Sequence, residues 1–382
     1  MVSHYSGVMP LLAILASPAH ASDAIYTVTE LGTLGGDCSV ALSINNAGQI
    51  VGRSSLSDGY IHAFLWQLGV MIDLDPDGFF SEAWGINDAG IIVGLRPLDL
   101  NLPRRPVIYA NGSFVDLGTL GGPYGWARRV NNAGAIVGTA MTRELRMHAV
   151  IWSAGGITDL GSIGGFQAIA HEINESGVVT GVVDYEQAKS HAIMWTDGEA
   201  TDLGNLGGSW ATAASINDDG IIVGNSQTAA GATHGFRWTA TEGMVDLGTF
   251  PGCVNLLTND INRHGDIVGA VWPCKGSGFA VLWKDGRIID LNTVVPPGSI
   301  AIYGAGDIND AGQIIGTSGR KAVLLTPVGL GDIDNDGHVA VIDLLVLLAS
   351  WGSCAADCPA DLNHDGVVDR LDLMLLLGNW HP

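Results

Sequence analysis

The sequence predicts an all-β fold, a β-propeller of seven four-stranded blades closed by an N-terminal strand, followed by a small helical module. Three observations lead to this prediction. A motif recurs about every 43 residues through most of the chain. Glycine contributes 54 of 382 residues and charged residues only 15%, which is typical of short strands and tight turns. Residues 328–382 contain nine Asp and one Arg, so we expect a separate domain there.

An Asp-Leu step marks the period of the repeat. It recurs at spacings of 43, 43, 43, 44 and 44 residues, at Asp73, Asp116, Asp159, Asp202, Asp246 and Asp290. Between these steps each unit repeats Leu-Gly-x-Leu-Gly-Gly, then Ile/Val-Asn-x-x-Gly-x-Ile-Val-Gly, then His-Ala-x-x-Trp. The Asn of the second element occurs seven times, at Asn45, Asn87, Asn131, Asn174, Asn217, Asn262 and Asn309. The chain therefore contains seven units.

Each unit has four short apolar, β-branched or aromatic runs separated by Asn, Asp and Gly turn signals, the pattern of an antiparallel meander. In the first unit, residues 45–48 form a predicted hairpin turn in which Gly48 is free to take a positive φ. Four-stranded units of this length are typical of propeller blades.

The two ends of the repeat region predict a closed ring. The seventh unit stops after residues 321–327 and lacks its own Asp-Leu strand, whereas residues 24–32 read as that same strand before the first unit. Pairing of the two would remove both open sheet edges, which a linear stack would have to cap. We therefore expect residues 22–327 to form a closed propeller rather than an open solenoid.

The N-terminus resembles a secretory signal peptide. An apolar run over residues 9–16 precedes an Ala-x-Ala site that predicts cleavage after Ala21, so residues 1–21 would be removed. No Lys or Arg precedes the apolar run, and a misassigned start site is the alternative. We expect a secreted protein, extracellular or at the cell surface. No other segment approaches 18 apolar residues, so no membrane span is predicted.

Five cysteines in an exported chain suggest disulfides with one thiol left over. Cys354 and Cys358 are close in sequence and are expected to pair. Cys253 and Cys274 lie in one repeat unit and could pair as well, which would leave Cys38. Spacing alone leaves other connectivities open.

The repeat units resemble HAF repeats, found in bacterial exported proteins, through the His-Ala-Phe of residues 62–64. The resemblance covers about residues 25–327 and implies no established activity. The His is present at His62, His148, His191 and His234, but Arg105, Phe279 and Lys321 take its place in other units. Because catalysis needs one asymmetric constellation, we interpret the repeated His as structural, donating to a neighbouring backbone carbonyl; a ring of metal ligands is the alternative. The Leu-Gly-x-Leu-Gly-Gly element is read as a turn, since no Lys-Ser/Thr follows it.

Candidate ligand-binding residues gather where the Gly-Gly connections and the variable stretches are predicted to share the face opposite the Asn turns. Aromatic rings there could stack on sugars, and an Arg-rich sector of the second and third units could bind carboxylate or sulfate groups. The candidates are Tyr124, Trp126, Trp210, Trp84, Arg128 and Arg129. Packing between blades, a plug in the channel mouth and solvated surface charge are the alternatives. For a hydrolase, the only acidic or basic candidates are His171, Glu172, Glu175, Asp184 and Glu186, and their spacing makes no pair.

The C-terminal segment contains two Asp-rich loops that predict two calcium sites. Oxygen ligands at loop positions 1, 3, 5 and 12, a backbone carbonyl at position 7 and a Gly at position 6 suit Ca²⁺. The first loop offers Asp332, Asp334, Asp336, His338 (by its carbonyl) and Asp343. The second offers Asp361, Asn363, Asp365, Val367 (by its carbonyl), Asp369 and Asp372. Ala340 stands at position 9 of the first loop, where Asp369 stands in the second, so the first site is expected to need a water and to be weaker.

With Asp at position 12 and one apolar helix after each loop, residues 331–380 resemble a type I dockerin. The resemblance implies calcium-dependent folding and docking onto a cohesin. The positions that read the partner are usually small hydroxyl residues, but here they are Val341 and Ile342 in one copy and Arg370 and Leu371 in the other. The partner is therefore expected to be a cohesin-like or another surface protein, and an intramolecular clamp on the propeller is an open alternative.

Together these features predict an exported, non-catalytic binding or surface protein, with polysaccharide as the expected propeller ligand. The alternative is a dockerin-linked carbohydrate-active enzyme that hydrolyses O-glycosyl bonds, because dockerins are commonly fused to polysaccharide hydrolases. Binding is favoured because the sequence shows no convergent acid pair, nucleophile elbow or metal triad. The formal net charge of −22 argues against a nucleic-acid partner.

Overall fold

The structure is a computed structural model that describes residues 26–99, 102–110, 112–185, 189–272, 274, 277–334, 338–354 and 358–380. The expected signal peptide, Glu186 and Asp336 lie outside these residues. None of the helices in the described part of the chain has the length and apolar character needed to cross a bilayer.

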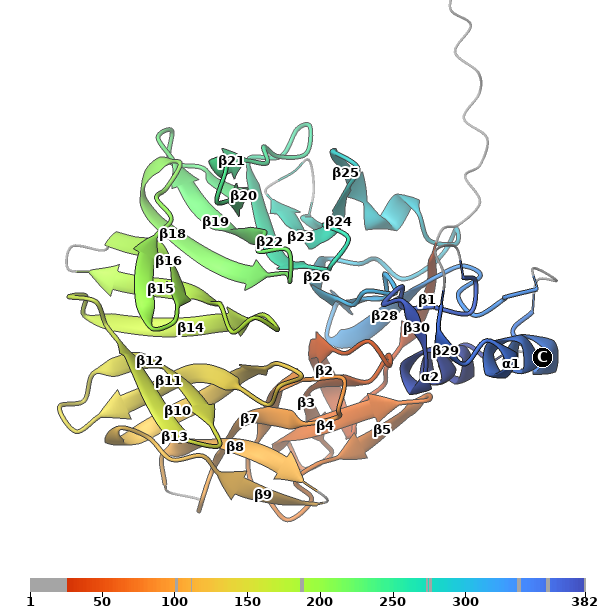
Figure 1. Ribbon diagram of the computed structural model, residues 1–382, viewed down its shortest axis with the longest axis horizontal. Coiled ribbons are helices and arrows are strands. Elements are labelled where there is room, and N and C mark those ends of the chain that lie inside the picture. Colours follow the sequence, from red (N-terminus) through yellow and green to blue (C-terminus); the bar gives the residue numbers. More distant parts are fainter. Residues whose placement is uncertain are drawn as a thin grey trace, which may run out of the picture.

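The all-β prediction is confirmed for the repeat region. Within the described residues, five sheets have four strands, and an eight-stranded sheet consists of two four-stranded halves joined by one bridge pair, Ser190 and Trp210. Figure 1 shows the sheets arranged in a ring, in chain order.

The first group consists of β2 (Gly35–Ile44), β3 (Ile50–Leu56), β4 (Ile61–Gln67) and β5 (Val70–Asp73), and the second of β6 (Glu82–Ile86), β7 (Ile92–Pro97), β8 (Arg104–Ala110) and β9 (Ser113–Asp116). The third group consists of β10 (Gly121–Val130), β11 (Ile136–Thr142), β12 (Met147–Ser153) and β13 (Gly156–Gly161). The fourth consists of β14 (Gln167–Ile173), β15 (Val179–Tyr185), β16 (Lys189–Thr196) and β17 (Glu199–Asp202). The others are β18 (Gly207–Ile216), β19 (Ile222–Thr228), β20 (Thr233–Thr239) and β21 (Gly243–Asp246); β22 (Asn255–Ile261), β23 (Ile267–Trp272), β24 (Phe279–Lys284) and β25 (Arg287–Asp290), with the short helix η1 (Leu291–Thr293); and β26 (Gly304–Ile308), β27 (Ile314–Ser318) and β28 (Lys321–Pro327), completed by β1 (Tyr26–Glu30).

The pairing of the N-terminal strand with the last sheet is confirmed. Strand β1 pairs antiparallel with β28, from Tyr26 opposite Pro327 to Glu30 opposite Val323. The sheet formed by β26, β27, β28 and β1 therefore contains both ends of the repeat region, so that its outer edge is filled by the first strand.

A second closure runs through the Asn residues of the seven turns. Each Asn side-chain amide donates to the backbone carbonyl of the next Asn, and the last one donates to the first, at distances of 2.9 to 3.3 Å. Each Asn carbonyl oxygen also accepts a backbone N–H within its own turn, as from Ala135 to Asn131 at 2.9 Å. The Asn residues are buried, so these bonds are shielded from water. The repeated Asn thus fixes the turn and links it to its neighbour.

The first strand of each unit carries a β-bulge at the same place. The register shifts between two residues of the strand, as between Ala127 and Arg129 in β10, and the shift recurs in all seven units. The Gly of Ile-Val-Gly faces this irregularity: a Cβ on Gly138 would collide with the Trp126 carbonyl, and the equivalent Gly of the other units faces the equivalent carbonyl. A bulge turns two successive side chains out of strict alternation.

The hydrophobic core lies between neighbouring sheets. Val51 and Ala63 of one sheet are fully buried against Ala83, Ile86 and Val107 of the next, and similar clusters follow around the ring. Because each cluster needs two sheets, a single unit could not bury its apolar residues alone.

The prediction that the repeated His donates to a backbone carbonyl needs correction. In each of the four units, His Nδ1 contacts the carboxylate of the Asp-Leu Asp, at 2.5 to 3.0 Å, in the pairs His62 and Asp73, His148 and Asp159, His191 and Asp202, and His234 and Asp246. Within the described part of the chain, His62 is the one of these four that also contacts a carbonyl, that of Gly78 at 3.1 Å. The Asp is the nearer partner because the third and fourth strands of each sheet, such as β4 and β5, are hydrogen-bonded neighbours. Arg105 takes the same place opposite Asp116, at 3.1 Å.

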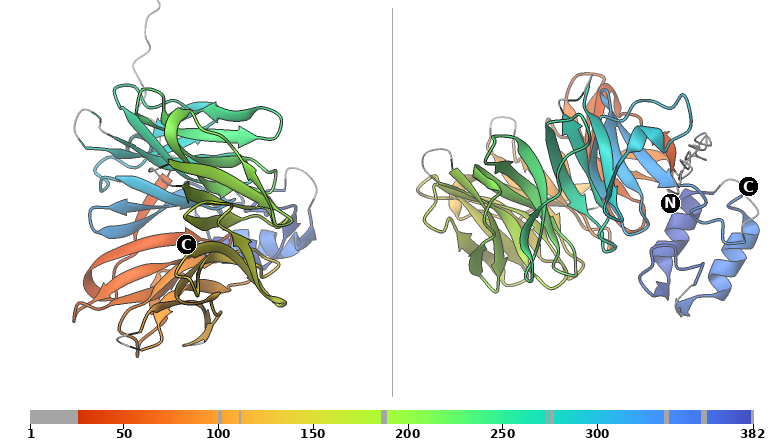
Figure 2. Two further views of the ribbon diagram at one scale, coloured as in Figure 1. Left: turned by 90° about the vertical axis from the view of Figure 1, so that its left-hand side faces the viewer. Right: turned by 90° about the horizontal axis from the view of Figure 1, so that it is seen from above.

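The two expected disulfides are present, Cys253–Cys274 and Cys354–Cys358, and Cys38 is free. In the C-terminal module, α1 (Val341–Ala349) and α2 (Arg370–Gly378) follow the two Asp-rich segments, and β29 (Gly352–Ser353) pairs with β30 (Val367–Val368). Val339, Leu347, Val368 and Leu376 form its fully buried core. The module lies beside the ring, next to β1 and β28 (Figures 1 and 2).

Candidate functional site

The face opposite the Asn turns carries the Gly-Gly connections and the variable stretches, as predicted. In the first unit Gly35 lies opposite Leu56, while Ile44 lies opposite Ile50 at the turn end. A groove of about 640 Å³ opens between β7 and β8 on one side and β10 to β12 on the other. Its lining residues are Leu95, Leu102, Pro103, Arg104, Tyr124, Gly125, Trp126, Met141 and Met147.

Two of the six candidate ligand residues line this groove. Tyr124 is 45% exposed, and Trp126 is half-buried beside it. The guanidinium of Arg104 lies 4.3 Å from the centroid of the Phe80 ring, which holds this cation at the groove. Trp210 lies elsewhere, where its strand bridges to Ser190.

The other three candidates lie at the centre of the ring rather than on an exposed sector. Arg129 Nε donates to Glu172 at 2.8 Å, and its Nη2 donates to Asp307 at 3.3 Å and to the Leu42 carbonyl at 3.4 Å. It also donates to the Trp84 carbonyl. These partners come from β14, β26, β2 and β6, and only facing inner strands can bring them together. The bulge explains this placement, since it turns residues 128 and 129 toward the channel.

Trp84 and Arg128 lie on the same inner layer. The Trp84 indole donates to Glu82 at 2.8 Å, and the Arg128 guanidinium lies 5.3 Å from the centroid of its ring. Burial, and then the charge of Arg129, lower the pKa of Arg128 to about 10. Burial, followed by Arg128, lowers the pKa of His171 to about 3, and its Nδ1 donates to the Ala213 carbonyl at 2.8 Å. His171 is therefore neutral and serves as a donor.

Two further carboxylates of this cluster, Asp260 and Asp307, were missed by the sequence reasoning. Asp260 accepts from Ser215 at 2.6 Å and from the Ile308 backbone at 2.9 Å. Burial, and then the neighbouring Asp307, raise the pKa of Asp260 well above its usual range. Burial also raises the pKa of Glu172 against the opposing effect of Arg129. The available signal was the position two residues before each Asn, which varies as Ser43, Gly85, Arg129, Glu172, Ser215, Asp260 and Asp307.

The hydrolase candidates do not form a catalytic pair. Glu172 contacts Arg129, whereas Glu175 lies in the mouth of the channel at the Asn turns and accepts the Asn132 backbone N–H at 2.9 Å. Asp184 accepts from Gln167 at 2.6 Å. Each carboxylate thus has a different partner, and the described residues bring no two of these three into contact.

In the first Asp-rich loop, Asp332, Asp334 and Asp343 place carboxylate oxygens within 4.8 Å of one another. Asp343 also accepts the backbone N–H groups of Ile333 at 2.7 Å and Ala340 at 2.8 Å. The His338 side chain is exposed.

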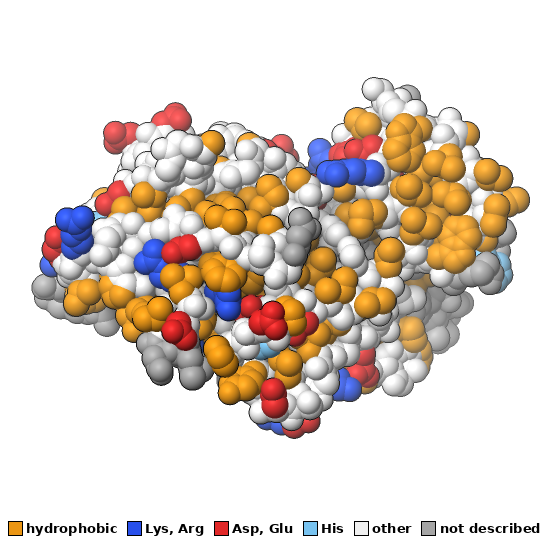
Figure 3. Space-filling view, turned by 90° about the horizontal axis from the view of Figure 1, so that it is seen from below, with side chains coloured by type: hydrophobic (Ala, Val, Ile, Leu, Met, Phe, Trp, Pro, Cys, Tyr) orange, Lys and Arg blue, Asp and Glu red, His pale blue; other side chains and the backbone are white. Residues whose placement is uncertain are grey.

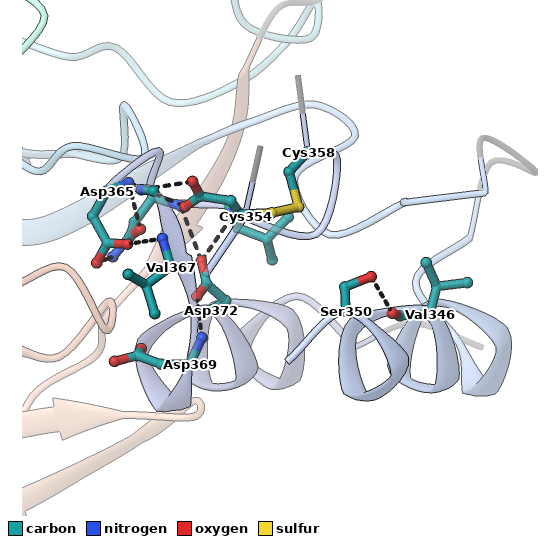
Figure 4. The surroundings of a disulfide bond; sticks show 12 residues. Val346, Ser350, Cys354, Cys358, Asp365, Val367, Asp369 and Asp372 are labelled. Carbon is teal, nitrogen blue, oxygen red and sulfur yellow. Dashed lines mark hydrogen bonds between the residues drawn. A yellow bond between two sulfur atoms is a disulfide. The ribbon is translucent and has the colours of Figure 1, made fainter. Parts of the chain in front are cut away.

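The second loop is organised in the same way (Figure 4). Asp372 accepts from Leu362 at 2.7 Å and from Asp369 at 2.8 Å, and Asp361 accepts from Asp365 at 3.0 Å and from Gly366 at 2.8 Å. Asn363 donates to Asp365 at 3.1 Å, and the Val367 backbone donates to Asp365 at 2.8 Å. Asp369 caps α2 by accepting from Leu371 at 2.7 Å, so its second oxygen is the one available to an ion.

Comparisons with protein-family models and with curated proteins find no match. Among solved structures, the chain is similar to a puromycin hydrolase variant in complex with PGG (TM-score 0.52, 12% identity, 74% of this chain and 50% of that chain). It also matches the β-propeller domain of the Trilobed protease from Pyrococcus furiosus (0.49, 12%, 76% and 94%) and a gluconolactonase from Xanthomonas campestris (0.41, 13%, 81% and 93%). At these identities the likeness concerns the fold alone.

Proposed function

We propose that this chain is an exported, non-catalytic binding protein, in which a closed seven-bladed propeller offers a ligand groove and a dockerin-like module attaches it to a partner. The ring of seven Asn hydrogen bonds supports the blade number, with the eight-stranded sheet counted as two blades because one bridge pair joins its halves. The signal-like N-terminus supports export.

The observation that carries the binding function is the groove beside Tyr124. It combines an exposed aromatic ring, two flexible Met side chains and the Arg104 cation, a mixture that suits the apolar face and the polar edge of a sugar. The carboxylates that a hydrolase would need are instead engaged with Arg129, Ser215 and backbone donors. We therefore favour polysaccharide binding over hydrolysis.

Retention of the full chain on a panel of immobilised polysaccharides tests this function. Tyr124→Ala is expected to weaken retention roughly fivefold to tenfold, the loss of one aromatic contact. Phe166→Ala is the matched control, because Phe166 is 64% exposed on another connection and does not line the groove. Release of reducing sugar that disappears in Glu175→Gln would instead support the hydrolase.

For the module we propose two calcium ions. Asp332, Asp334, Asp336, Asp343 and the His338 carbonyl would hold one, and Asp361, Asn363, Asp365, Asp369, Asp372 and the Val367 carbonyl the other. The all-oxygen donor set suits this cation. Bound calcium would neutralise a region in which eight Asp residues repel one another, so its binding would be coupled to folding.

Calorimetry of the full chain with calcium measures these sites directly. Two bound ions are expected, and Asp332→Ala and Asp361→Ala should each remove one. Unchanged heats in both variants would reject the assignment.

The partner surface that we propose is the outer face of α1, for a cohesin-like or other surface protein. Val341, Ile342, Leu345, Leu348 and Trp351 are 48 to 58% exposed there. Figure 3 shows apolar side chains gathered over the module. A contiguous exposed apolar patch of this kind is typical of a protein interface. Capture of the partner that is lost in Leu345→Asp, but not in Val115→Asp on the propeller, where Val115 is 55% exposed, would support this assignment.

A further inference from the structure

The second half of the C-terminal module contacts the Asn-turn face of the propeller. Arg263, in the turn after β22, donates to the His364 carbonyl at 3.1 Å, and Arg370 of α2 donates to the Asp88 carbonyl at 3.1 Å. The rings of His264 and His364 meet edge to face at 5.7 Å. His364 occupies position 4 of the second Asp-rich loop. The contacts therefore reach two turns that are far apart in the chain and join them to one loop and its helix.

Apolar contacts accompany these polar ones. Leu375 of α2 lies over the turn at Gly48, where an added Cβ would be 3.7 Å from its Cδ2 atom. Met374, Leu377 and Trp380 line the same crevice as Trp66 and Leu68 of the propeller. Ala311, in the turn before β27, packs against the module core. Four turns of the propeller, those at residues 48, 88, 263 and 311, thus meet the α2 half.

The two halves of the module are sequence copies, but they differ in exposure. Counted from Asp343 and Asp372, Ile342 corresponds to Leu371, and Val346 corresponds to Leu375. Ile342 is 57% exposed and Leu371 only 8%, while Val346 is 36% exposed and Leu375 only 1%. Side chains that are exposed in the α1 half are therefore buried at the equivalent positions of the α2 half.

Both sides of this interface are acidic. The propeller side presents Asp88 and Asp310. Asp285 lines the cavity that contains His364, together with Asp266, which is paired with Lys284 at 2.7 Å. The module side presents the second loop, with Asp361, Asp365, Asp369 and Asp372. Like charges brought together by docking repel one another, and the two Arg contacts oppose this repulsion. A divalent cation in the loop would lower the charge of these four carboxylates from −4 to −2 and so weaken the repulsion across the interface.

We propose that calcium bound in the second loop closes an intramolecular dock between the α2 half and the Asn-turn face, while the α1 half is left for an external partner. The inference rests on the proposed calcium function, and it adds that the two sites have different tasks. Loading of the second site holds the module against the propeller. Loading of the first site shapes the free α1 face.

Hydrogen exchange of the full chain, with calcium and with a chelator, tests the dock. The readout is the exchange rate of propeller turns, not of the module itself. Calcium is expected to slow exchange about fivefold or more at residues 46–49, 88–90, 263–265 and 310–312. The equivalent turns at 132–134, 175–177 and 218–220 make no described contact with the module and should not change.

Two kinds of variant separate docking from calcium binding. Asp361→Ala should abolish the calcium effect at the four turns, whereas Asp332→Ala in the first loop should retain it. The double variant Arg263→Ala/Arg370→Ala leaves both loops intact, so calorimetry should still find two calcium ions while the turn protection falls.

The outcomes distinguish the two proposals. Two calcium ions bound with no change at the contacted turns would overturn the dock and leave the calcium function standing. The absence of any calcium heat would overturn both. Protection lost in Asp332→Ala but kept in Asp361→Ala would also overturn the dock, since it assigns the effect to the wrong loop.

Discussion

Arg129, Glu172, Asp260 and Asp307 form a buried cluster of ionisable side chains at the centre of the ring. Substitution of Arg129 by Met (Arg129→Met) tests the contribution of this cluster to stability. Arg129 bridges Glu172 and Asp307 and donates to backbone carbonyls of two other inner strands. Met has a similar length but no charge, so the variant leaves buried carboxylates without a counter-ion. Removing one partner of a buried ion pair typically costs about 3–5 kcal/mol. The melting temperature should fall by an amount on the order of 10 °C.

The loss should depend on pH in a defined direction. Burial already raises the pKa of Glu172, and Arg129 opposes that rise. Without Arg129 the folded-state pKa rises further, so the native state holds protons that the unfolded chain, with a carboxyl pKa of roughly 4, has released. A raised folded-state carboxyl pKa means that stability is lost as pH increases above the unfolded value. Relative to wild type, the variant should therefore lose least stability at pH 4 and progressively more toward pH 7, on top of a pH-independent loss of the hydrogen bonds to the two carbonyls.

Thermal unfolding of both proteins from pH 4 to pH 8 measures this difference. Arg237→Met is the matched control, because Arg237 pairs with Glu242 at 2.8 Å on the surface, and exposed pairs contribute about 0–1 kcal/mol. Adding Glu172→Gln to Arg129→Met should recover part of the loss at pH 7. A variant within about 0.5 kcal/mol of wild type at pH 7, or one whose loss is the same at all pH values, would refute the reasoning.

Two further variants test the repeated residues. Asn131→Ala leaves the Ala135 N–H and the Asn174 carbonyl without their partner and should destabilise the chain by about 1–3 kcal/mol. Asn132→Ala, at the exposed neighbouring position, should cost well under that. Chemical denaturation compares the two variants, and equal losses would contradict a stabilising role of the Asn ring. Gly138→Ala places a methyl group against the Trp126 carbonyl and should destabilise the chain by about 1–3 kcal/mol. Gly155→Ala should be tolerated, because the nearest neighbour of the added Cβ is Ser153 Oγ at 3.7 Å. Chemical denaturation compares them, and an undiminished stability of Gly138→Ala would mean that the bulge can relax.

Period and turn chemistry were sufficient to predict the sheets and the pairing of the first strand with the last. The period located every unit, and the missing strand of the seventh unit matched residues 24–32. These features depend on local pattern, which one sequence displays in full. The disulfides followed similarly from proximity along the chain.

Contacts between units were not predicted. The Asn turns read as local hairpins, yet the Asn45 amide bonds to the Asn87 carbonyl, a partner 42 residues away. The repeated His was expected to find a carbonyl, but the Asp of the neighbouring strand is nearer. Arg129 read as surface charge because strict strand alternation hides a bulge. In each case the partner is supplied by closure of the ring, which no single unit contains.

The repeats also constrain where function can lie. Residues that recur in every unit, such as the Asn and the Gly of Ile-Val-Gly, are fully used in holding sheets together. Chemistry that distinguishes one ligand from another needs side chains that differ between units. Those occur at the bulge positions, where Arg129 pairs with Glu172 and Asp307 while Asp260 accepts from Ser215, and at the outer connections, where Tyr124 and Arg104 line the groove. The same argument applies to the duplicated module: its halves share the loop residues of the proposed calcium sites but differ at Ile342 and Leu371, where the proposed dock distinguishes them.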